Sequence, residues 1–230
     1  MRLGLAGSKE ILSLSTRGGS ELVCDSLLRQ FRRAGARRVL VVIGHGKGDI
    51  PETLGDSRAG LDLAYLTIED SPSTVHTLDR ATELVADAVV AVGFPDIVLQ
   101  PDDILARALD RQRATGADVV LGLLPARRPE KVDMVALDGN GAVVGIEIKP
   151  ASTTLRYAWV VAVWTPAFTR FLHEYAAAPQ DHGRELYVGD VILAARSEGI
   201  RVDGVVAEEG SFFDVGTCDE LEEARVSLSA

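Results

Sequence analysis

Residues 88–96 read AVVAVGFPD and place an acidic turn directly after a continuous apolar run. The apolar part is typical of a buried strand, so Asp96 is expected where that strand reaches the surface. A second acidic turn, FDVGT at residues 213–217, follows another apolar run. The carboxyl ends of strands form the ligand crevice of an open α/β sheet, which predicts that Asp96 and Asp214 meet over one ligand. Such a pair suits a divalent metal ion and a phosphorylated ligand.

Around this stretch, apolar strands alternate with helical segments. Continuous apolar runs predict buried strands at residues 1–6, 38–43, 61–66, 88–92 and 119–124. The spacing of apolar residues predicts a helix from Ser20 to Gly35 and further helices at residues 74–85 and 102–115. This alternation predicts an α/β fold with a mostly parallel, doubly wound sheet.

The second half of the chain adds antiparallel strands to this plan. Asp138-Gly139-Asn140-Gly141 separates the apolar segments 132–137 and 142–148, which predicts a tight hairpin. Further strands are predicted at residues 157–164 and 200–207, and helices at residues 166–178, 188–197 and 218–227. No linker, low-complexity tract or internal repeat divides the sequence, so we predict a single domain over residues 1–230.

The composition indicates a folded protein that handles small molecules. Of its 230 residues, 47% are hydrophobic and 25% are charged, which is enough to bury a substantial core. The formal net charge of -10 argues against a nucleic acid partner, because extended phosphate backbones favour a basic face. Cys24 and Cys218 do not suggest a disulfide framework or a zinc site, and no signal peptide or membrane segment is expected. We therefore expect a cytoplasmic protein.

Several short motifs occur along the chain in the order in which one enzyme family carries them. Leu5-Ala6-Gly7 and the following residues 8–14, SKEILSL, resemble the L-A-G and S-K-x-L-L-P-V motifs of that family. Residues 93–96 are similar to its L-G-D turn, residues 147–150 to its E-K-P signature, and residues 212–217 to its W-x-D-T-G-T segment. Over nearly its whole length, the chain therefore resembles the sugar-1-phosphate nucleotidyltransferases, the group that includes glucose-1-phosphate thymidylyltransferase.

The resemblance implies a Rossmann-like nucleotide-binding core of the glycosyltransferase A type. It also implies transfer of a nucleoside monophosphate from a nucleoside triphosphate to a phosphorylated sugar or sugar-like molecule, with release of pyrophosphate. Asp96 and Asp214 would then hold Mg²⁺, which prefers one or two carboxylates together with water and phosphate oxygens. Lys9 would contact the α-phosphate or the sugar phosphate as a point charge, and Lys9 and Asp96 are the catalytic residues that the resemblance implies. A homo-oligomer is compatible with the resemblance.

The same resemblance implies two sets of binding residues. Contacts with the nucleotide are implied for Leu5, Ala6, Gly7, Ser73, Thr74 and Asp96, since residues 71–77 resemble the family's S-P-x-G-T-A stretch beside the base. Contacts with the acceptor phosphate molecule are implied for Glu147, Lys149, Tyr157, Trp159 and Val161. Periodicity also places Trp159 in the core, because strand residues alternate between faces.

One part of the family pattern is missing. The glycine-rich loop G-x-G-T-R-L, which wraps the triphosphate with backbone N–H groups, is absent between Gly7 and Ser8, and Arg17-Gly18-Gly19 is either a replacement or a plain turn. A non-catalytic relative that binds nucleotide or nucleotide-sugar, as a sensor or partner subunit, is therefore an alternative. A metal-dependent glycosyltransferase is less favoured, because no D-x-D triplet follows a central strand and Asp102-Asp103 opens a helix.

Overall fold

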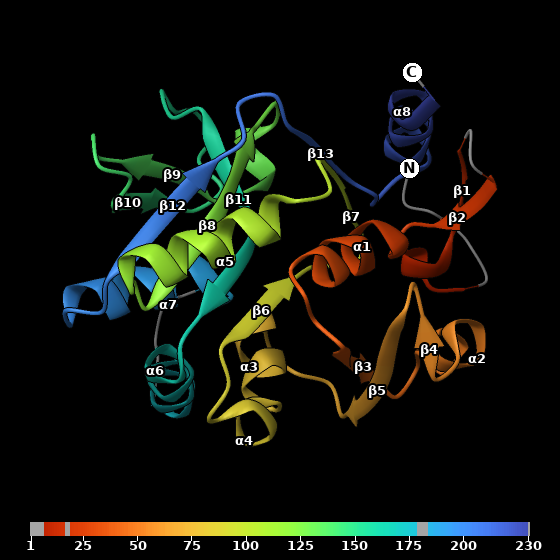
Figure 1. The fold of residues 1–230 in the computed structure, drawn as a ribbon, viewed down its shortest axis with the longest axis horizontal. Helices are drawn as coiled ribbons and strands as arrows, with labels where there is room; N and C mark the ends of the chain where they lie inside the picture. The colour runs from red at the N-terminus through yellow and green to blue at the C-terminus, as the bar shows by residue number, and fades with distance from the viewer. Residues whose placement is uncertain (1–6, 17–18, 179–183, 230) are drawn as a thin grey trace.

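The largest sheet of the computed structural model, which describes residues 7–16, 19–178 and 184–229, has six strands (Figure 1). Its strands are β6 (Val90–Gly93), β8 (Val119–Pro125), β9 (Met134–Leu137), β10 (Val143–Glu147), β11 (Tyr157–Trp164) and β12 (Val202–Val206). β12 runs parallel to β8, whereas β11 runs antiparallel to β6, β8 and β9. The strands β6, β8, β9 and β12 therefore share one direction. The α/β fold with antiparallel additions is confirmed.

Two strands follow one another along a single edge of β11. β9 pairs with Tyr157 and Ala158, whereas β6 pairs with residues 161–164. Between these pairings, at Trp159 and Val160, the edge of β11 changes its neighbour from β9 to β6. We call this position the strand break. Positions where neighbouring strands diverge are where α/β sheets commonly bind ligands.

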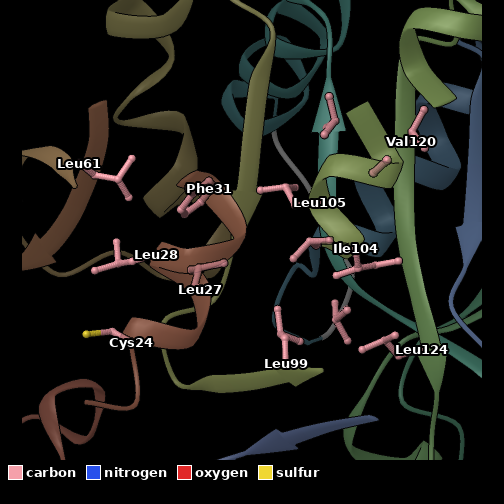
Figure 2. Close-up of a cluster of buried hydrophobic side chains, with 14 of the residues drawn as sticks. Cys24, Leu27, Leu28, Phe31, Leu61, Leu99, Ile104, Leu105, Val120 and Leu124 are labelled. Carbon is pink, nitrogen blue, oxygen red and sulfur yellow. The ribbon is translucent and has the colours of Figure 1, made fainter. Parts of the chain in front are cut away.

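Helices cover the two faces of this sheet. On one face lie α1 (Asp25–Arg33) and α5 (Ile104–Thr115), and on the other lie α3 (Thr74–Asp79), α6 (Pro166–Ala177) and α7 (Val188–Ser197), while the short α4 (Thr82–Val85) contacts α6. The side chains of β8 alternate between the two cores, because successive strand residues point to opposite faces. Figure 2 shows Val120 and Leu124 on the α1 and α5 side, whereas Leu121 and Leu123 belong to the opposite cluster.

The predicted strands at residues 38–43 and 61–66 form a separate sheet beside α1. β3 (Arg38–Gly44) runs parallel to β5 (Leu61–Ile68), and the short β4 (Ser57–Arg58) pairs with β5 on its other edge. The loop after β3 leads into α2 (Asp49–Leu54). The predicted hairpin between β9 and β10 is also present, with the Asp138 carboxylate accepting the N–H groups of Asn140 and Ala142 at 2.8 and 2.9 Å.

The helix predicted to begin at Ser20 was wrong in its start. Residues 19–22 form β2 (Gly19–Leu22), which pairs with β1 (Ser13–Thr16), and α1 begins only at Asp25. The Asp25 carboxylate accepts the Leu22 N–H at 2.8 Å and binds Arg58 Nη2 at 2.6 Å. These contacts fix the turn between strand and helix, although Leu22 fits helical spacing. The strand predicted at residues 1–6 lies outside the described residues.

A small two-stranded sheet completes the fold near the start of the described chain. β7 (Ile97–Gln100) pairs with β13 (Ser211–Asp214), which leads into α8 (Cys218–Ser229). Two short turns of 3-10 helix, η1 (Lys9–Ile11) and η2 (Pro129–Lys131), lie outside the sheets. Among the residues that the structure describes, no helix is long and apolar enough to cross a bilayer.

Candidate active site

Lys9, Asp96 and Asp214 come together beyond the end of β6, and we call them the Lys9 cluster. Lys9 Nζ lies 2.5 Å from Asp96 Oδ2, with 36% and 23% of the two side chains exposed. β7 pairs with β13 so that Asp214 lies opposite Ile97, and the Val215 N–H donates to the Asp96 carbonyl at 2.9 Å. This short ladder brings together the two acidic turns that lie far apart in the sequence.

The charges of the Lys9 cluster influence one another. Burial alone would lower the pKa of Lys9, but the hydrogen bond and charge of Asp96, together with the charge of Asp214, raise it above its usual value. Burial raises the pKa of Asp214, and the negative charge of Asp96 raises it further, while Lys9 acts in the opposite direction. The two carboxylates thus repel each other across a site that favours a cation.

Tethers on both sides of Lys9 hold it in place. Asp49, at the start of α2, accepts the Ser8 N–H at 2.6 Å and the Ser8 hydroxyl at 2.8 Å. Both of these hydrogen bonds lower the pKa of Asp49. On the other side, Lys47 Nζ lies 3.0 Å from Glu10 Oε2. Lys9 therefore lies between Ser8, which is bonded to α2, and Glu10, which is bonded to the loop before α2.

A buried glutamate fixes the turn that carries Asp214. Glu220, whose exposure is 5%, accepts the Gly216 N–H at 3.1 Å and the Thr217 hydroxyl at 3.0 Å. Its other oxygen lies 2.8 Å from Arg128 Nη1 and 2.5 Å from Lys131 Nζ. Burial opposes ionisation, but the hydrogen bonds from Lys131 and Thr217 lower the pKa of Glu220. Sequence reasoning missed this residue, which follows the acidic turn by a few positions.

A pocket with a volume of about 360 Å³ opens beside Asp214. Its lining combines the end of β8, η2 and the segment that leads into β13, and it contains both basic and acidic side chains. Arg128 and Lys131 line it and bind Glu220, while Arg156 pairs with Glu208 at 3.1 Å. Most of its charges are therefore already paired within the protein.

A second group of polar side chains gathers around the strand break, and we call Asp133, Lys149, Trp159, Arg184 and Tyr187 the Asp133 cluster. Asp133 precedes β9, and its carbonyl accepts the Trp159 N–H at 3.4 Å. The Trp159 indole Nε1–H also donates to Asp133 Oδ2 at 3.4 Å. Both side chains are buried, with 8% and 7% exposed. The Trp159 ring packs against Phe94 at 5.5 Å between centroids.

Two cations of the Asp133 cluster lie against one aromatic ring. Lys149 Nζ lies 4.0 Å from the centre of the Tyr187 ring, and Arg184 Cζ lies 5.1 Å from it. Lys149 follows β10 with a left-handed φ of 41°. Arg184 Nη2 also lies 2.8 Å from Asp190 Oδ1 in the first turn of α7. Arg184 Nη1 also donates to Asp190 Oδ2 at 2.9 Å, so part of the positive charge beside this ring is already paired within the protein.

Sequence reasoning missed Asp133, Arg184 and Tyr187. It placed Asp133 inside a strand from 132 to 137, whereas β9 begins at Met134. A carboxylate within an otherwise apolar segment was the available signal. The residues that surround it come from β11 and α7, so their approach depends on the three-dimensional fold.

The predicted nucleotide contacts occupy different environments. Gly7 is exposed and adjoins the tethered Ser8, whereas Leu5 and Ala6 lie outside the described residues. Ser73 is 6% exposed and caps α3, where its hydroxyl accepts the His76 N–H at 3.4 Å and lies 2.8 Å from His76 Nδ1. Thr74 is exposed at the start of α3. The Ser73 hydroxyl is thus engaged by its own helix, and its contact with a base stays a prediction.

The predicted acceptor contacts are also divided. Trp159 and Lys149 belong to the Asp133 cluster, and Glu147 is exposed at the end of β10. The Tyr157 hydroxyl donates to Glu208, which turns it toward the pocket beside Asp214. Val161 is fully buried, and its methyl groups fill the space left by Gly93 and Gly122. The structure shows a packing role for Val161, and its contact with an acceptor stays a prediction.

The Lys9 cluster has the chemistry of a partial magnesium site. Asp96 and Asp214 supply hard carboxylate oxygens near solvent, and the Lys9 ammonium already stands where positive charge is favoured. Within the described ranges, no group of three or more His, Cys, Asp or Glu side chains is placed to hold an ion. A magnesium ion here would therefore need water and phosphate oxygens to complete its shell.

Comparison with known proteins identifies the family. The nucleotidyl transferase family matches residues 14–230, and the chain belongs to it. Relatives include the bifunctional protein GlmU of Dinoroseobacter shibae, which is 27% identical over 218 residues that make up 89% of this chain and 47% of that protein. The corresponding protein of Paracidovorax citrulli is 30% identical over 186 residues, 76% of this chain and 38% of its own. The chain spans less than half the length of these relatives.

Solved structures show the same fold. A protein assigned as glucose-1-phosphate thymidylyltransferase from Bacillus anthracis, in complex with sucrose, aligns with a TM-score of 0.81 at 16% identity and covers 96% of this chain and 87% of its own. The UDP-glucose pyrophosphorylase of Acinetobacter baumannii aligns with a TM-score of 0.77 at 17% identity, over 96% and 86% of the two chains. The predicted resemblance to sugar-1-phosphate nucleotidyltransferases is confirmed.

Proposed function

We propose that this chain transfers a nucleoside monophosphate from a nucleoside triphosphate to a sugar-1-phosphate or a similar phosphorylated molecule, releasing pyrophosphate. The observation that carries the proposal is the Lys9 cluster, in which Lys9 lies 2.5 Å from Asp96 and Asp214 adjoins both through the β7 and β13 ladder. An ammonium and two carboxylates at a strand end provide the charges that phosphoryl chemistry requires. Membership of the nucleotidyl transferase family supports it.

In the proposed reaction, the main task of the protein is to align the acceptor phosphate with the α-phosphate of the triphosphate. An anionic oxygen of the acceptor phosphate attacks the α-phosphorus of the triphosphate and forms a new P–O bond. The bond between the α-phosphorus and the bridging oxygen breaks, and pyrophosphate leaves with that electron pair. Because the attacking oxygen is already anionic, no general base is needed. Lys9, whose pKa is raised, stays protonated and offers its charge to the phosphate groups.

Magnesium belongs to this proposal. Asp96 and Asp214 would hold the ion, and when bound it would neutralise charge on the transferring phosphate and the pyrophosphate. In the structure, the Lys9 ammonium forms an ion pair with Asp96. Binding of the metal ion by Asp96 would therefore weaken this ion pair.

We assign the remaining predicted contacts to two subsites. The nucleotide would lie along Leu5, Ala6, Gly7, Ser73 and Thr74, beside Asp96. The acceptor would lie at the strand break, against Glu147, Lys149, Tyr157, Trp159 and Val161. Lys149 and Arg184 flank the Tyr187 ring and would bind the acceptor phosphate. We propose small-molecule substrates, no nucleic acid partner, a cytoplasmic setting and a possible homo-oligomer.

A pyrophosphate-release assay over nucleoside triphosphates and sugar phosphates tests the proposal. Release that needs both substrates and stops on removal of Mg²⁺ with EDTA supports it. Mass spectrometry of the reaction should show the nucleoside diphosphate derivative of the acceptor. Absence of product with every pair contradicts the proposed transfer.

The missing glycine-rich loop favours a second candidate, a non-catalytic protein that binds nucleotide or nucleotide-sugar. Without that loop, a triphosphate loses backbone N–H groups that would hold its β- and γ-phosphates. Calorimetry separates the two functions. Tight binding of a nucleotide-sugar without pyrophosphate release would support the second candidate.

A further inference from the structure

Asp133 is buried with one carboxylate oxygen unsatisfied. Its exposure is 8%, and Oδ1 has no hydrogen-bond partner within the described part of the chain. The other oxygen accepts the Trp159 indole N–H at the long distance of 3.4 Å. Buried polar atoms without a partner are rare in native proteins, because each loses its hydration without compensation. Asp133 therefore requires an explanation beyond packing.

The position of Asp133 is equally unusual. It lies at the strand break, where the edge of β11 passes from β9 to β6, and it faces the first turn of α7. A side chain at Gly189 would come within 2.7 Å of Asp133 Oδ2, so the helix approaches the carboxylate closely. Phe94 and Tyr187 are half-buried and Lys149 is exposed, so the buried carboxylate lies close to solvent-facing residues.

Burial disfavours the ionised form of Asp133. Burial raises the pKa of Asp133, although the Trp159 indole and the charge and backbone N–H of Lys149 act in the opposite direction. The raised pKa thus reflects burial, and no donor among the described residues lies within hydrogen-bond geometry of Oδ1. Groups that cost stability are commonly retained for function.

We propose that Asp133 selects the acceptor by accepting a hydrogen bond at Oδ1 from a hydroxyl or ammonium group of the acceptor molecule. This inference rests on the proposed function and names the part of the acceptor that is recognised. Lys149 and Arg184 would hold the acceptor phosphate, and Asp133 would read a donor group carried by the same molecule. The Trp159 ring, packed against Phe94, would cover the apolar side of that molecule.

The central experiment compares Asp133→Asn with wild type over four kinds of acceptor. They are glucose 1-phosphate, its singly deoxygenated analogues, glucosamine 1-phosphate and ethanolamine phosphate. In the variant, the Asn oxygen is expected to face the Trp159 N–H and its NH₂ group the acceptor, so an acceptor ammonium meets a second donor and an acceptor hydroxyl must reverse its hydrogen bond. We expect kcat/KM for the preferred acceptor to fall by roughly tenfold to a hundredfold, and the preference over the analogue lacking the donor to disappear.

Two control variants separate selection from structure. Glu130→Gln removes an exposed charge from η2, close in sequence, and should leave the acceptor profile unchanged. Trp159→Phe removes the indole N–H but keeps an aromatic ring. If Asp133 only anchors Trp159, this variant should reproduce the acceptor profile of Asp133→Asn, and that result would overturn the proposal.

A binding measurement tests Asp133 without turnover. The emission of Trp159 is obtained as the difference between wild type and Trp159→Phe, and each acceptor is titrated against it. Loss of affinity in Asp133→Asn for acceptors with the donor, but not for the deoxygenated analogue, supports the proposal. Preference for hydroxylated sugar phosphates identifies a hydroxyl donor, and preference for the two amines identifies an ammonium.

The outcomes distinguish this inference from the proposed function. Nucleotidyl transfer by wild type with an acceptor profile unchanged in Asp133→Asn overturns the role of Asp133 alone. No transfer with any substrate pair overturns the proposed function, and acceptor binding that still depends on Asp133 would retain the subsite. No acceptor-dependent change in Trp159 emission across the panel overturns the proposed subsite.

Discussion

The Lys9 cluster and the Asp133 cluster differ in how their carboxylates are paired and exposed. In the Lys9 cluster, Asp96 meets an ammonium at 2.5 Å, and both side chains are partly exposed. In the Asp133 cluster, one oxygen of a buried carboxylate has no donor among the residues that the structure describes, and the Lys149 ammonium lies over the face of Tyr187. The difference indicates a division of work. In our proposal, the Lys9 cluster acts on the transferring phosphate groups, and the Asp133 cluster binds and recognises the acceptor.

The largest expected effect on activity comes from removing the carboxylates of the Lys9 cluster. Asp96→Asn and Asp214→Asn should each lower kcat by several powers of ten, because each removes charge from the proposed magnesium site. The double variant should lose little more, since residues that act as a unit are strongly non-additive. Asp87→Asn, which changes an exposed carboxylate after α4, serves as the control. Full activity in Asp96→Asn would remove the Lys9 cluster from the chemistry.

The next effect concerns the ammonium of the same cluster. Lys9→Gln should lower kcat/KM by about a hundredfold, because a positive charge aimed at the phosphates is lost. Lys9→Arg retains the charge and should recover part of the activity, although its planar fork differs from an ammonium. Steady-state kinetics over a range of triphosphate concentrations checks this. Equal activity in Lys9→Gln and wild type would show that Lys9 serves only to neutralise Asp96.

The third expected effect concerns the two cations of the Asp133 cluster and the KM for the acceptor. Lys149→Gln and Arg184→Gln should each raise the acceptor KM by about tenfold with a smaller change in kcat. In our proposal, the native side chains bind the acceptor phosphate both before and during transfer. Arg170→Gln, an exposed position on α6, provides a matched control. If the triphosphate KM rises instead of the acceptor KM, the assignment of the two subsites is wrong.

The sequence predicted the Lys9 cluster more readily than the Asp133 cluster for a physical reason. Asp96 and Asp214 each follow an apolar run, and strand ends meet at one edge of a sheet. Asp133 gains its character from Trp159 and Gly189, which approach it only through the pairing of β11 and the packing of α7. The sequence around Asp133 does not indicate this burial, because β11 and α7 are distant in the sequence.

The same limit explains the wrong start of the first helix. Leu22 fits a helical stripe, but pairing with β1 holds it in β2. The hairpin at Asp138, by contrast, was predictable because its turn residues bond within a few positions of one another. The turn of the hairpin is thus fixed by its own residues, whereas the start of α1 depends on the pairing of β1 with β2 and on the contact of Asp25 with Arg58.

A smaller effect tests how Lys9 is held. Asp49→Asn should lower kcat/KM by roughly threefold to tenfold, because the Ser8 N–H and hydroxyl lose a charged acceptor and Lys9 becomes less well positioned. Glu52→Gln, exposed on the same helix, is the control. Asp49 acts through Ser8, so Lys9→Gln should abolish any further effect of Asp49→Asn in the double variant. Additive losses would indicate an independent role for Asp49.

The smallest expected effect is on stability and distinguishes the two clusters by pH. Burial raises the native pKa of Asp133 above the usual 3.8, so the native state binds more protons than the unfolded state just above that pH. Its contribution to the free energy of unfolding must therefore fall as the pH rises from about 4 through the native pKa. Lys9 behaves differently, because its raised pKa gives stability that is lost only as the pH rises above the usual 10.5.

Urea unfolding of wild type and Asp133→Asn between about pH 4 and pH 8 measures this contribution. The variant has no carboxylate to ionise, and Asn retains an oxygen for the Trp159 indole, so it should gain on wild type by about 1 kcal/mol or less toward neutral pH. Glu130→Gln should show no such trend, since its side chain is exposed. If Asp133→Asn instead loses stability as the pH rises, the carboxylate stabilises the fold, and the contrast between the two clusters would no longer hold.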